Sequence, residues 1–148
     1  MTEPPIPTLP CLCANFRRAS RALTLLYDQA LRPLGLRATQ FTVLQALSLA
    51  GEVTQGKLGR ILAMDSTTLT RTLEILTRNG WIAGRHGKDR RERWLRLAGS
   101  GEAQLQRALP RWQKVQARLR LRFGTKGWDS LLQLTNEVTK VATKGGLS

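Results

Sequence analysis

Arginine and lysine side chains crowd one short stretch of the chain, GKDRRERWLRL at residues 87–97, around the acid Asp89. A guanidinium group binds phosphate oxygens and also fits the narrow minor groove of A·T-rich DNA. We therefore expect Arg91 to enter a minor groove, with Arg90 and Arg93 beside it on phosphates. Asp89 would aim Arg91 by holding its guanidinium in a two-pronged ion pair. A solvated charge run without a partner is the alternative interpretation.

A second group of polar side chains shares one face of the helix expected within DSTTLTRTLEILTRNG, residues 65–80. The members that could touch DNA are Ser66, Thr67, Thr68, Thr70 and Arg71. The first three stand at the helix N-terminus, where free N–H groups and the positive end of the helix dipole attract phosphate. One turn further on, Thr70 and Arg71 could reach base edges, and Arg71 is the best candidate for guanine in the major groove. Alternatively, the hydroxyl groups only cap the helix.

The sequence offers few ligands for a metal and no set of residues for catalysis. His86 is the only histidine, and it lies far from the only cysteines, Cys11 and Cys13. We therefore predict no metal site and no cofactor. No nucleophile and base stand at a spacing that suits catalysis, which argues against an enzyme.

The two cysteines also allow a redox hypothesis. A thiol at the start of a helix, close to arginines, is placed to react with oxidants. A buried, unreactive Cys is the alternative. A disulfide between Cys11 and Cys13 is not expected, because residues two apart on a helix lie on nearly opposite faces.

Charge and composition indicate which partners the surface attracts. The 148 residues include 24 Lys and Arg against 10 Asp and Glu, a formal net charge of +14. Such a surface attracts polyanions, so nucleic acid or an anionic membrane would fit. No apolar run is long enough to span a membrane, and the opening MTEPPIPTLP lacks the features of a secretion signal. We therefore expect a cytoplasmic protein with no membrane partner.

Hydrophobic periodicity places most of the chain in helices. Four prolines keep residues 1–10 out of helix, and we expect a flexible N-terminal arm there. The first helix should run from about Cys11 to Leu31. A second helix, capped by Thr39, and a short third helix, opened by Thr54, follow it.

The short third helix should bury Leu58, Ile61 and Leu62, and the helix after it should bury a face of leucines. WIAGR and RWLRL flank the basic stretch as two strands of a hairpin. Beyond the hairpin we expect a long helix to about Arg122, kinked at Pro110. The order helix, turn, helix, ribbon is that of a winged helix-turn-helix.

These elements make a mainly α fold with a small β-hairpin wing, divided between two regions. We assign residues 35–101 to a winged helix-turn-helix that binds DNA, and residues 11–34 and 102–144 to a helical dimerisation region. A last helix should close the chain before Gly145 and Gly146. Its apolar stripe and that of the first helix are too extended for one small chain to cover, so we expect a second copy to pack against them.

Four segments in order resemble the MarR-type transcriptional regulators, dimeric winged-helix proteins that commonly answer to small aromatic or oxidising molecules. The segments are LRPLGLRATQFTVLQAL, TQGKLGRILAMDSTTLTRTLEILTRNGWIAGR, DRRERWLRLAGSG and ALPRWQKVQ. The third holds the family's wing signature, an Asp and an Arg two positions apart, at Asp89 and Arg91. Three positions depart from the family pattern: Gly59 replaces an alanine, Ala63 a turn glycine and Ala98 a capping threonine. Each departure would cost up to ~1 kcal/mol of stability.

The resemblance also implies an effector pocket between the dimer interface and the DNA-reading region. Arg17 and Arg18 would offer a cation to a carboxylate or phenolate. Phe16, Phe41 and Trp112 would form apolar walls. Basic side chains that simply face solvent are the alternative for the two arginines.

These features predict a homodimeric, sequence-specific DNA-binding regulator of transcription. We expect a repressor on a palindromic operator, released by a small aromatic effector or by an oxidant. A basic protein that binds RNA, or DNA in an architectural role, without reading sequence is the alternative. That protein would need neither a dimer nor a palindromic site.

Overall fold

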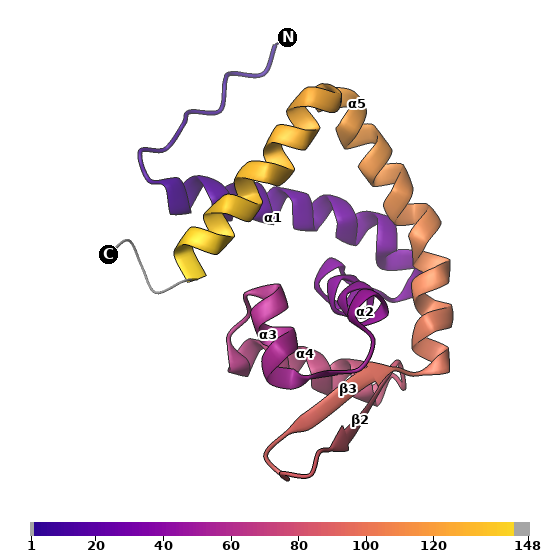
Figure 1. The fold of residues 1–148 in the computed structure, drawn as a ribbon. Coiled ribbons are helices and arrows are strands. Elements are labelled where there is room, and N and C mark those ends of the chain that lie inside the picture. The colour runs from indigo at the N-terminus through magenta and orange to yellow at the C-terminus, as the bar shows by residue number, and fades with distance from the viewer. Residues whose placement is uncertain (1, 144–148) are drawn as a thin grey trace.

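A computed structural model describes residues 2–143 as a mainly helical protein with one small antiparallel sheet (Figure 1). The helices are α1 (Leu12–Leu31), α2 (Ala38–Ala50), α3 (Gln55–Leu62), α4 (Ser66–Arg78) and α5 (Gly99–Thr143), with a 3₁₀ turn, η1, at Arg32–Leu34. The strands are β1 (Val53–Thr54), β2 (Ile82–His86) and β3 (Arg93–Leu97). The predicted fold class, helices with a hairpin wing, is therefore confirmed.

Figure 1 shows α3, α4 and the hairpin at one end of the molecule, and α1 with the far half of α5 at the other. Between these two ends lies α2, which packs against both α1 and α5. Gly145 and Gly146, expected to end the last helix, lie outside the described residues, as does the final residue of the region assigned to 102–144.

The leucines of α4 bury the face that periodicity predicted. Leu69, Leu73 and Leu76 are all at most 1% exposed and join one core with residues of α2, α3 and the sheet. Leu58 of α3 is also fully buried, but Ile61, expected to point inward, is 48% exposed. The face of α3 that packs on α4 includes Gly59, which lies against Leu69. Ile61, two positions later, is on the opposite side of the helix.

The turn between α3 and α4 depends on an unusual backbone conformation. Ala63 has φ 50° and ψ 40°, in the left-handed region that glycine adopts most readily. At the other end of α3, the Thr54 hydroxyl accepts the N–H of Lys57 at 3.2 Å, which confirms the predicted cap. A tight turn thus joins two short, well-capped helices.

The start of α2 differs from the prediction. Thr39 is inside the helix, which begins at Ala38. The carboxylate of Asp28 in α1 accepts the Ala38 N–H at 2.7 Å, and the Gln40 side chain accepts the Arg37 N–H at 3.0 Å. A carboxylate ten positions earlier therefore caps α2, and it also ties α2 to α1.

The sharpest break in the long helix is not at Pro110. The backbone keeps helical angles through Pro110, and the break is at Gly124, with φ 71° and ψ 163°. Pro110 and Gln106 are both exposed, so water can reach the carbonyl that loses its partner, and the helix continues. The expected end of the long helix near Arg122 is confirmed by this break, after which the chain folds back over α1 (Figure 1).

The sheet has the strand order β1, β3, β2, with both pairs antiparallel. The hairpin of β2 and β3 was predicted, but β1, only two residues long, was not. Trp94 in the central strand pairs with Thr54 on one side and with Arg85 on the other. Because α3 starts directly after β1, the sheet joins the hairpin to the helix-turn-helix.

Candidate nucleic-acid interface

The N-terminus of α4 is capped by Asp65. Its Oδ1 accepts the N–H of Thr68 at 2.9 Å, and its Oδ2 accepts the Thr68 hydroxyl at 2.6 Å. The hydroxyl bond and then the N–H bond hold the pKa of Asp65 below its usual value. Ser66 and Thr67 are exposed at this end of the helix, as predicted. Thr68 is committed to the cap, so it shapes the start of α4 and leaves Ser66 and Thr67 to face a partner.

Thr70 and Arg71 have different surroundings on α4. Thr70 is half-buried, and its hydroxyl accepts the side-chain N–H of Gln55, the first residue of α3, at 3.1 Å. Arg71 is exposed, and within residues 2–143 its guanidinium makes no hydrogen bond or ion pair. Thr70 therefore helps to hold α4 against α3, whereas Arg71 is available to a partner.

Asp89 shapes the wing tip through the backbone. Its Oδ1 accepts the N–H of Arg91 at 3.0 Å, and its carbonyl accepts the N–H of Glu92 at 2.9 Å. The ion pair predicted between Asp89 and the Arg91 guanidinium does not form in the described chain, because the carboxylate closes a tight turn. Arg90 and Arg91 are exposed at the tip, and Arg93 is half-buried on β3.

A second arginine site, at the base of the wing, was not predicted. Arg85 of β2 binds Glu52 with Nη2 at 2.6 Å from Oε1 and with Nε at 3.1 and 3.2 Å from the two carboxylate oxygens. Its guanidinium lies over the Trp94 ring, 5.2 Å from the centroid. The hydrogen bond from Arg85 lowers the pKa of Glu52, and the same bond raises the pKa of Arg85. Glu52 and Arg85 are 33 positions apart, and the pairing of both β1 and β2 with β3 brings them together.

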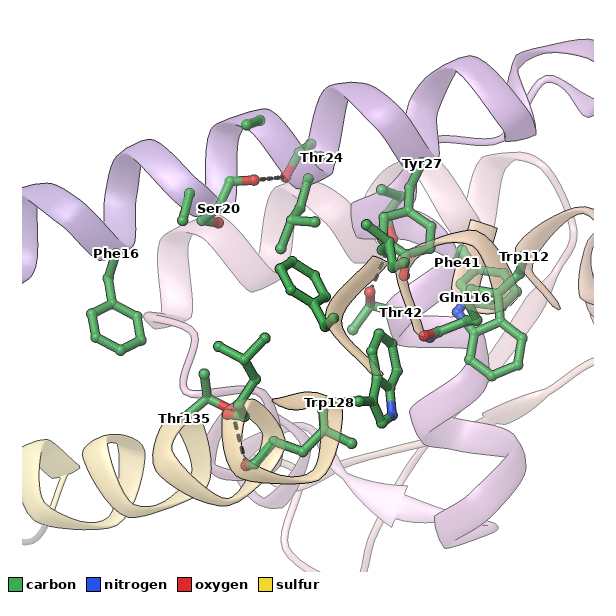
Figure 2. A pocket seen from close by; sticks show the side chains of 18 of the residues that line it. Phe16, Ser20, Thr24, Tyr27, Phe41, Thr42, Trp112, Gln116, Trp128 and Thr135 are labelled. Carbon is green, nitrogen blue, oxygen red and sulfur yellow. Dashed lines mark hydrogen bonds between the residues drawn. The ribbon is translucent and has the colours of Figure 1, made fainter. Parts of the chain in front are cut away.

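A cavity of about 860 Å³ lies between α1, α2 and both halves of α5 (Figure 2). Phe16, Phe41 and Trp112, predicted as apolar walls, all line it. The rings of Phe41 and Trp112 face each other at a tilt, with centroids 5.9 Å apart. Trp128, from the far half of α5, closes the same space from the side opposite α1.

The cation predicted for this cavity is absent from it. Among residues 2–143, no charged side chain lines the space. Arg18 donates to the Pro7 carbonyl at 3.0 Å and to the Asn15 side chain at 3.1 Å, so it binds the N-terminal arm, and Arg17 is exposed. The two arginines follow Phe16 by one and two positions, which turns them about 100° and 200° round α1 from the lining face.

The polar groups that do line the cavity are uncharged. Tyr27 reaches it from α1, and burial raises the pKa of its hydroxyl. The Oε1 atom of Gln116 is buried without a hydrogen-bond partner in the part of the chain that the structure describes. Figure 2 shows both side chains on the same side of the space as Trp112. The cavity thus offers an acceptor and a phenol within apolar walls.

Cys11 and Cys13 are both exposed, with free thiols, at the N-terminal end of α1. The burial that the alternative interpretation required is therefore absent from the single chain. Cys11 precedes the helix with extended angles, φ −97° and ψ 122°, so the two residues are not held on opposite faces of one helix.

Within residues 2–143, no group of three or more His, Cys, Asp or Glu side chains is arranged to hold a metal ion. The helices in the same range are too short or too polar to cross a bilayer.

Comparison with known sequences finds one family. A family model described as the MarR family matches residues 34–92. The chain is 32% identical over 91 residues to the uncharacterized HTH-type transcriptional regulator YwoH of Bacillus subtilis. That match covers 62% of this chain and 66% of the relative, slightly less than two thirds of its length.

Two solved structures that contain DNA resemble nearly the whole chain. One is the M. tuberculosis transcriptional regulator MosR in complex with DNA, with a TM-score of 0.80 and 36% identity over 88% of this chain and 94% of that one. The other is a mutant MarR from E. coli complexed with operator DNA, with a TM-score of 0.77 and 25% identity over 86% of this chain and 92% of that one.

Proposed function

Because this chain belongs to the MarR family of transcriptional regulators, we propose that it is a homodimeric repressor that reads a palindromic operator with α4 and the wing. One observation carries the proposal. Arg71 is exposed on a helix whose opposite face is fixed in the core, and the exposed Arg90 and Arg91 stand on the adjoining wing. The similarity to MosR, whose structure was solved in complex with DNA, supports DNA as the partner.

Exposed apolar side chains support a second copy of the chain. Leu25 of α1 is 65% exposed, and Leu121 and Leu134 of α5 are 84% and 56% exposed. A partner that covered such side chains would remove apolar surface from water, which favours association. In a two-fold dimer the two α4 helices would enter major grooves about one DNA turn, ~34–36 Å, apart, and the site would be palindromic.

Sequence-specific binding can be tested by selecting bound duplexes from a random pool and then titrating the protein with them at one salt concentration. We expect a palindromic preferred site. The variant Arg71→Ala should lose ~1–3 kcal/mol of affinity for it and relax one guanine position. Arg78→Ala, which removes an exposed arginine from the far end of the same helix, should leave the base preferences unchanged. A wild-type protein with no preferred duplex would contradict the proposal.

Competition with structured RNA separates this function from binding by charge alone. A repressor should hold its selected duplex against an equal concentration of RNA phosphate. A protein that binds by its net charge of +14 would release the duplex to RNA in proportion to phosphate added.

We further propose that a small aromatic effector enters the cavity of Figure 2, releases the DNA and is uncharged. The absence of charged lining residues within 2–143 makes burial of a carboxylate costly. The unpaired Gln116 Oε1 can accept a hydrogen bond from an N–H or O–H group of the ligand. Phe41 and Trp112 can stack on its ring.

The matched probes 1-naphthamide and 1-naphthoate test the charge of the ligand. We expect the amide to raise the melting temperature and to weaken DNA binding, and the carboxylate to do neither. Gln116→Leu should reduce the effect of the amide, whereas Gln113→Leu, at an exposed site on the same helix, should not. Stronger binding of the carboxylate would contradict the proposal.

Oxidation of Cys11 or Cys13 is the second proposed signal. Both thiols are exposed at the start of α1, close to the arm that Arg18 holds, so an oxidant can reach them. Diamide should release DNA from the wild-type protein but not from the double variant Cys11→Ser/Cys13→Ser. Unchanged DNA binding by a protein with both thiols modified would end this hypothesis.

A further inference from the structure

We propose that Glu52 is a positioning residue for sequence reading, because it holds Arg85 and thereby fixes the wing relative to α4. The proposal rests on the DNA-reading function above. Neither side chain belongs to the set expected to touch DNA. The role of the pair would be to keep the wing-tip arginines and Arg71 at the spacing that one duplex requires.

The pair joins the two edges of the sheet. Arg85 lies on β2 and Glu52 directly precedes β1, and these strands are the two outer strands of the order β1, β3, β2. To reach Glu52, Arg85 crosses the central strand over the Trp94 ring, 5.2 Å from its centroid. Three N–O contacts of 2.6 to 3.2 Å then close the bridge. A planar guanidinium held at two atoms and stacked on a ring has little freedom to reorient.

The contacts continue from Glu52 to α4 within four residues. Thr54 ends β1 and caps α3 by accepting the N–H of Lys57 at 3.2 Å. Gln55, the next residue, donates to Thr70 on α4 at 3.1 Å. Residues 52–55 therefore carry a bond to the wing at one end and a bond to α4 at the other. Without the Glu52 bond, β1 would hold the wing only through its two-residue pairing with β3.

The bond between Glu52 and Arg85 should affect DNA binding in two ways. First, it holds the wing at a fixed angle, so the wing arginines are at a high effective concentration once α4 is in its groove, and this advantage exists only on the correct duplex. In addition, Glu52 keeps Arg85 from binding phosphates of any sequence. Removal of the carboxylate should therefore weaken specific binding and strengthen nonspecific binding, which is a pattern that simple loss of folded protein does not produce.

Glu52→Gln tests the proposal, because the amide has nearly the same shape but no charge. The affinities for the selected duplex and for a scrambled duplex are measured at one salt concentration, together with the melting temperature. We expect the ratio of the two affinities to fall about tenfold, the scale of one mismatched base pair, with scrambled-duplex affinity unchanged or raised. Glu137→Gln makes the same charge change on the far half of α5, and it should leave the ratio unchanged.

The arginine side of the pair supplies a second test. Arg85→Gln should lower the ratio as Glu52→Gln does, whereas Arg96→Gln should not. Arg96 is the matched control because it is an exposed arginine on the same face of the sheet, and it donates only to a backbone carbonyl. The hydrogen bond from Arg85 lowers the pKa of Glu52 most, and the charge of Arg96 also lowers it, but less. The exchange Glu52→Arg/Arg85→Glu should restore part of the ratio by reforming the pair.

An unchanged ratio for Glu52→Gln, with or without a lower melting temperature, would overturn the inference, and so would equal losses for Arg85→Gln and Arg96→Gln. A wild-type protein that binds both duplexes equally would instead overturn the proposed function, so the two failures are distinguishable.

Discussion

Three acids near the DNA-reading face each hold a neighbouring group in place. Asp65 caps α4, Asp89 closes the wing turn and Glu52 binds Arg85. A free carboxylate at such a surface would repel phosphate, whereas an engaged carboxylate shapes the backbone and leaves other arginines exposed. Arg71, Arg90 and Arg91 are side chains that this arrangement leaves exposed.

The role of Asp89 can be tested by a pair of substitutions. Asp89→Asn keeps an oxygen that accepts the Arg91 N–H, so DNA affinity should change less than about threefold. Asp89→Ala removes the acceptor, loosens the turn and should weaken binding to A·T-flanked sites by about tenfold or more. Titration of both variants on one duplex is the measurement. Equal losses for Asn and Ala would show that the charge of Asp89, rather than its hydrogen bond, matters.

Gly101 is a site where a single methyl group should destabilise the fold. A Cβ at this position would overlap the carbonyl group of Trp81, which is backbone and cannot move aside easily. Gly101→Ala should therefore lower the free energy of unfolding by about 3 kcal/mol. Gly99→Ala, two residues earlier on the same helix and with open space around its Cβ, should change it by less than ~1 kcal/mol. Urea unfolding of both variants compares them, and similar midpoints would contradict the geometry.

At the scale of whole elements, the α3–α4 turn contains strain that one substitution should remove. Ala63 has a positive φ of 50°, which costs a residue with a Cβ about 1–2 kcal/mol. Ala63→Gly should raise stability by ~0.5–1 kcal/mol, because part of that gain is lost to the greater freedom of glycine in the unfolded chain. Ala117→Gly, at an exposed helical site in α5, should instead lower stability by ~1 kcal/mol. Thermal unfolding would show shifts of opposite sign, and a loss on Ala63→Gly would contradict the strain.

Elements were predictable from the sequence where neighbouring residues determine them. The leucine face of α4, the Thr54 cap and the hairpin all follow from patterns within a few residues, and all are confirmed. The cap of α2 was mispredicted because Asp28, ten positions away, supplies it. The Glu52–Arg85 bridge depends on a strand of two residues that carries no periodicity of its own. Tertiary contacts thus decided what local patterns could not.

The residues of the candidate site also divide into those that local patterns predicted and those that they did not. The exposure of Arg71 was predictable because helix periodicity fixes which face a side chain takes, and the exposure of Arg90 and Arg91 because they lie in the turn between the two strands. The prediction that Arg17 and Arg18 line the cavity was wrong. Their charge does not determine which face of α1 they occupy, and the face that lines the cavity carries Phe16 and its helical neighbours.

Over the whole molecule, the excess of basic residues should make DNA binding steeply dependent on salt. A net charge of +14 per chain can neutralise many phosphates, and ~6–10 contacts imply a loss of about 10³–10⁵ in affinity between ~50 and ~200 mM salt. Arg90→Gln should make the slope of log affinity against log salt shallower by about one, with base preferences unchanged. Titrations at four salt concentrations measure the slope, and a flat dependence would contradict binding through phosphates.

The two-fold arrangement can be tested with two leucines that are equally exposed in one chain. Leu121, on α5 before the Gly124 break, and Leu49, at the end of α2, are both 84% exposed. If a second copy covers the α5 region, a buried carboxylate at Leu121 would oppose association, whereas the same charge at Leu49 would remain in water. Sedimentation should therefore show a monomer for Leu121→Glu and a dimer for Leu49→Glu. The monomer should also lose about 10²–10⁴ in affinity for the palindrome, because each half-site would then be bound independently. A dimer that survives Leu121→Glu would place the interface on another surface of the chain.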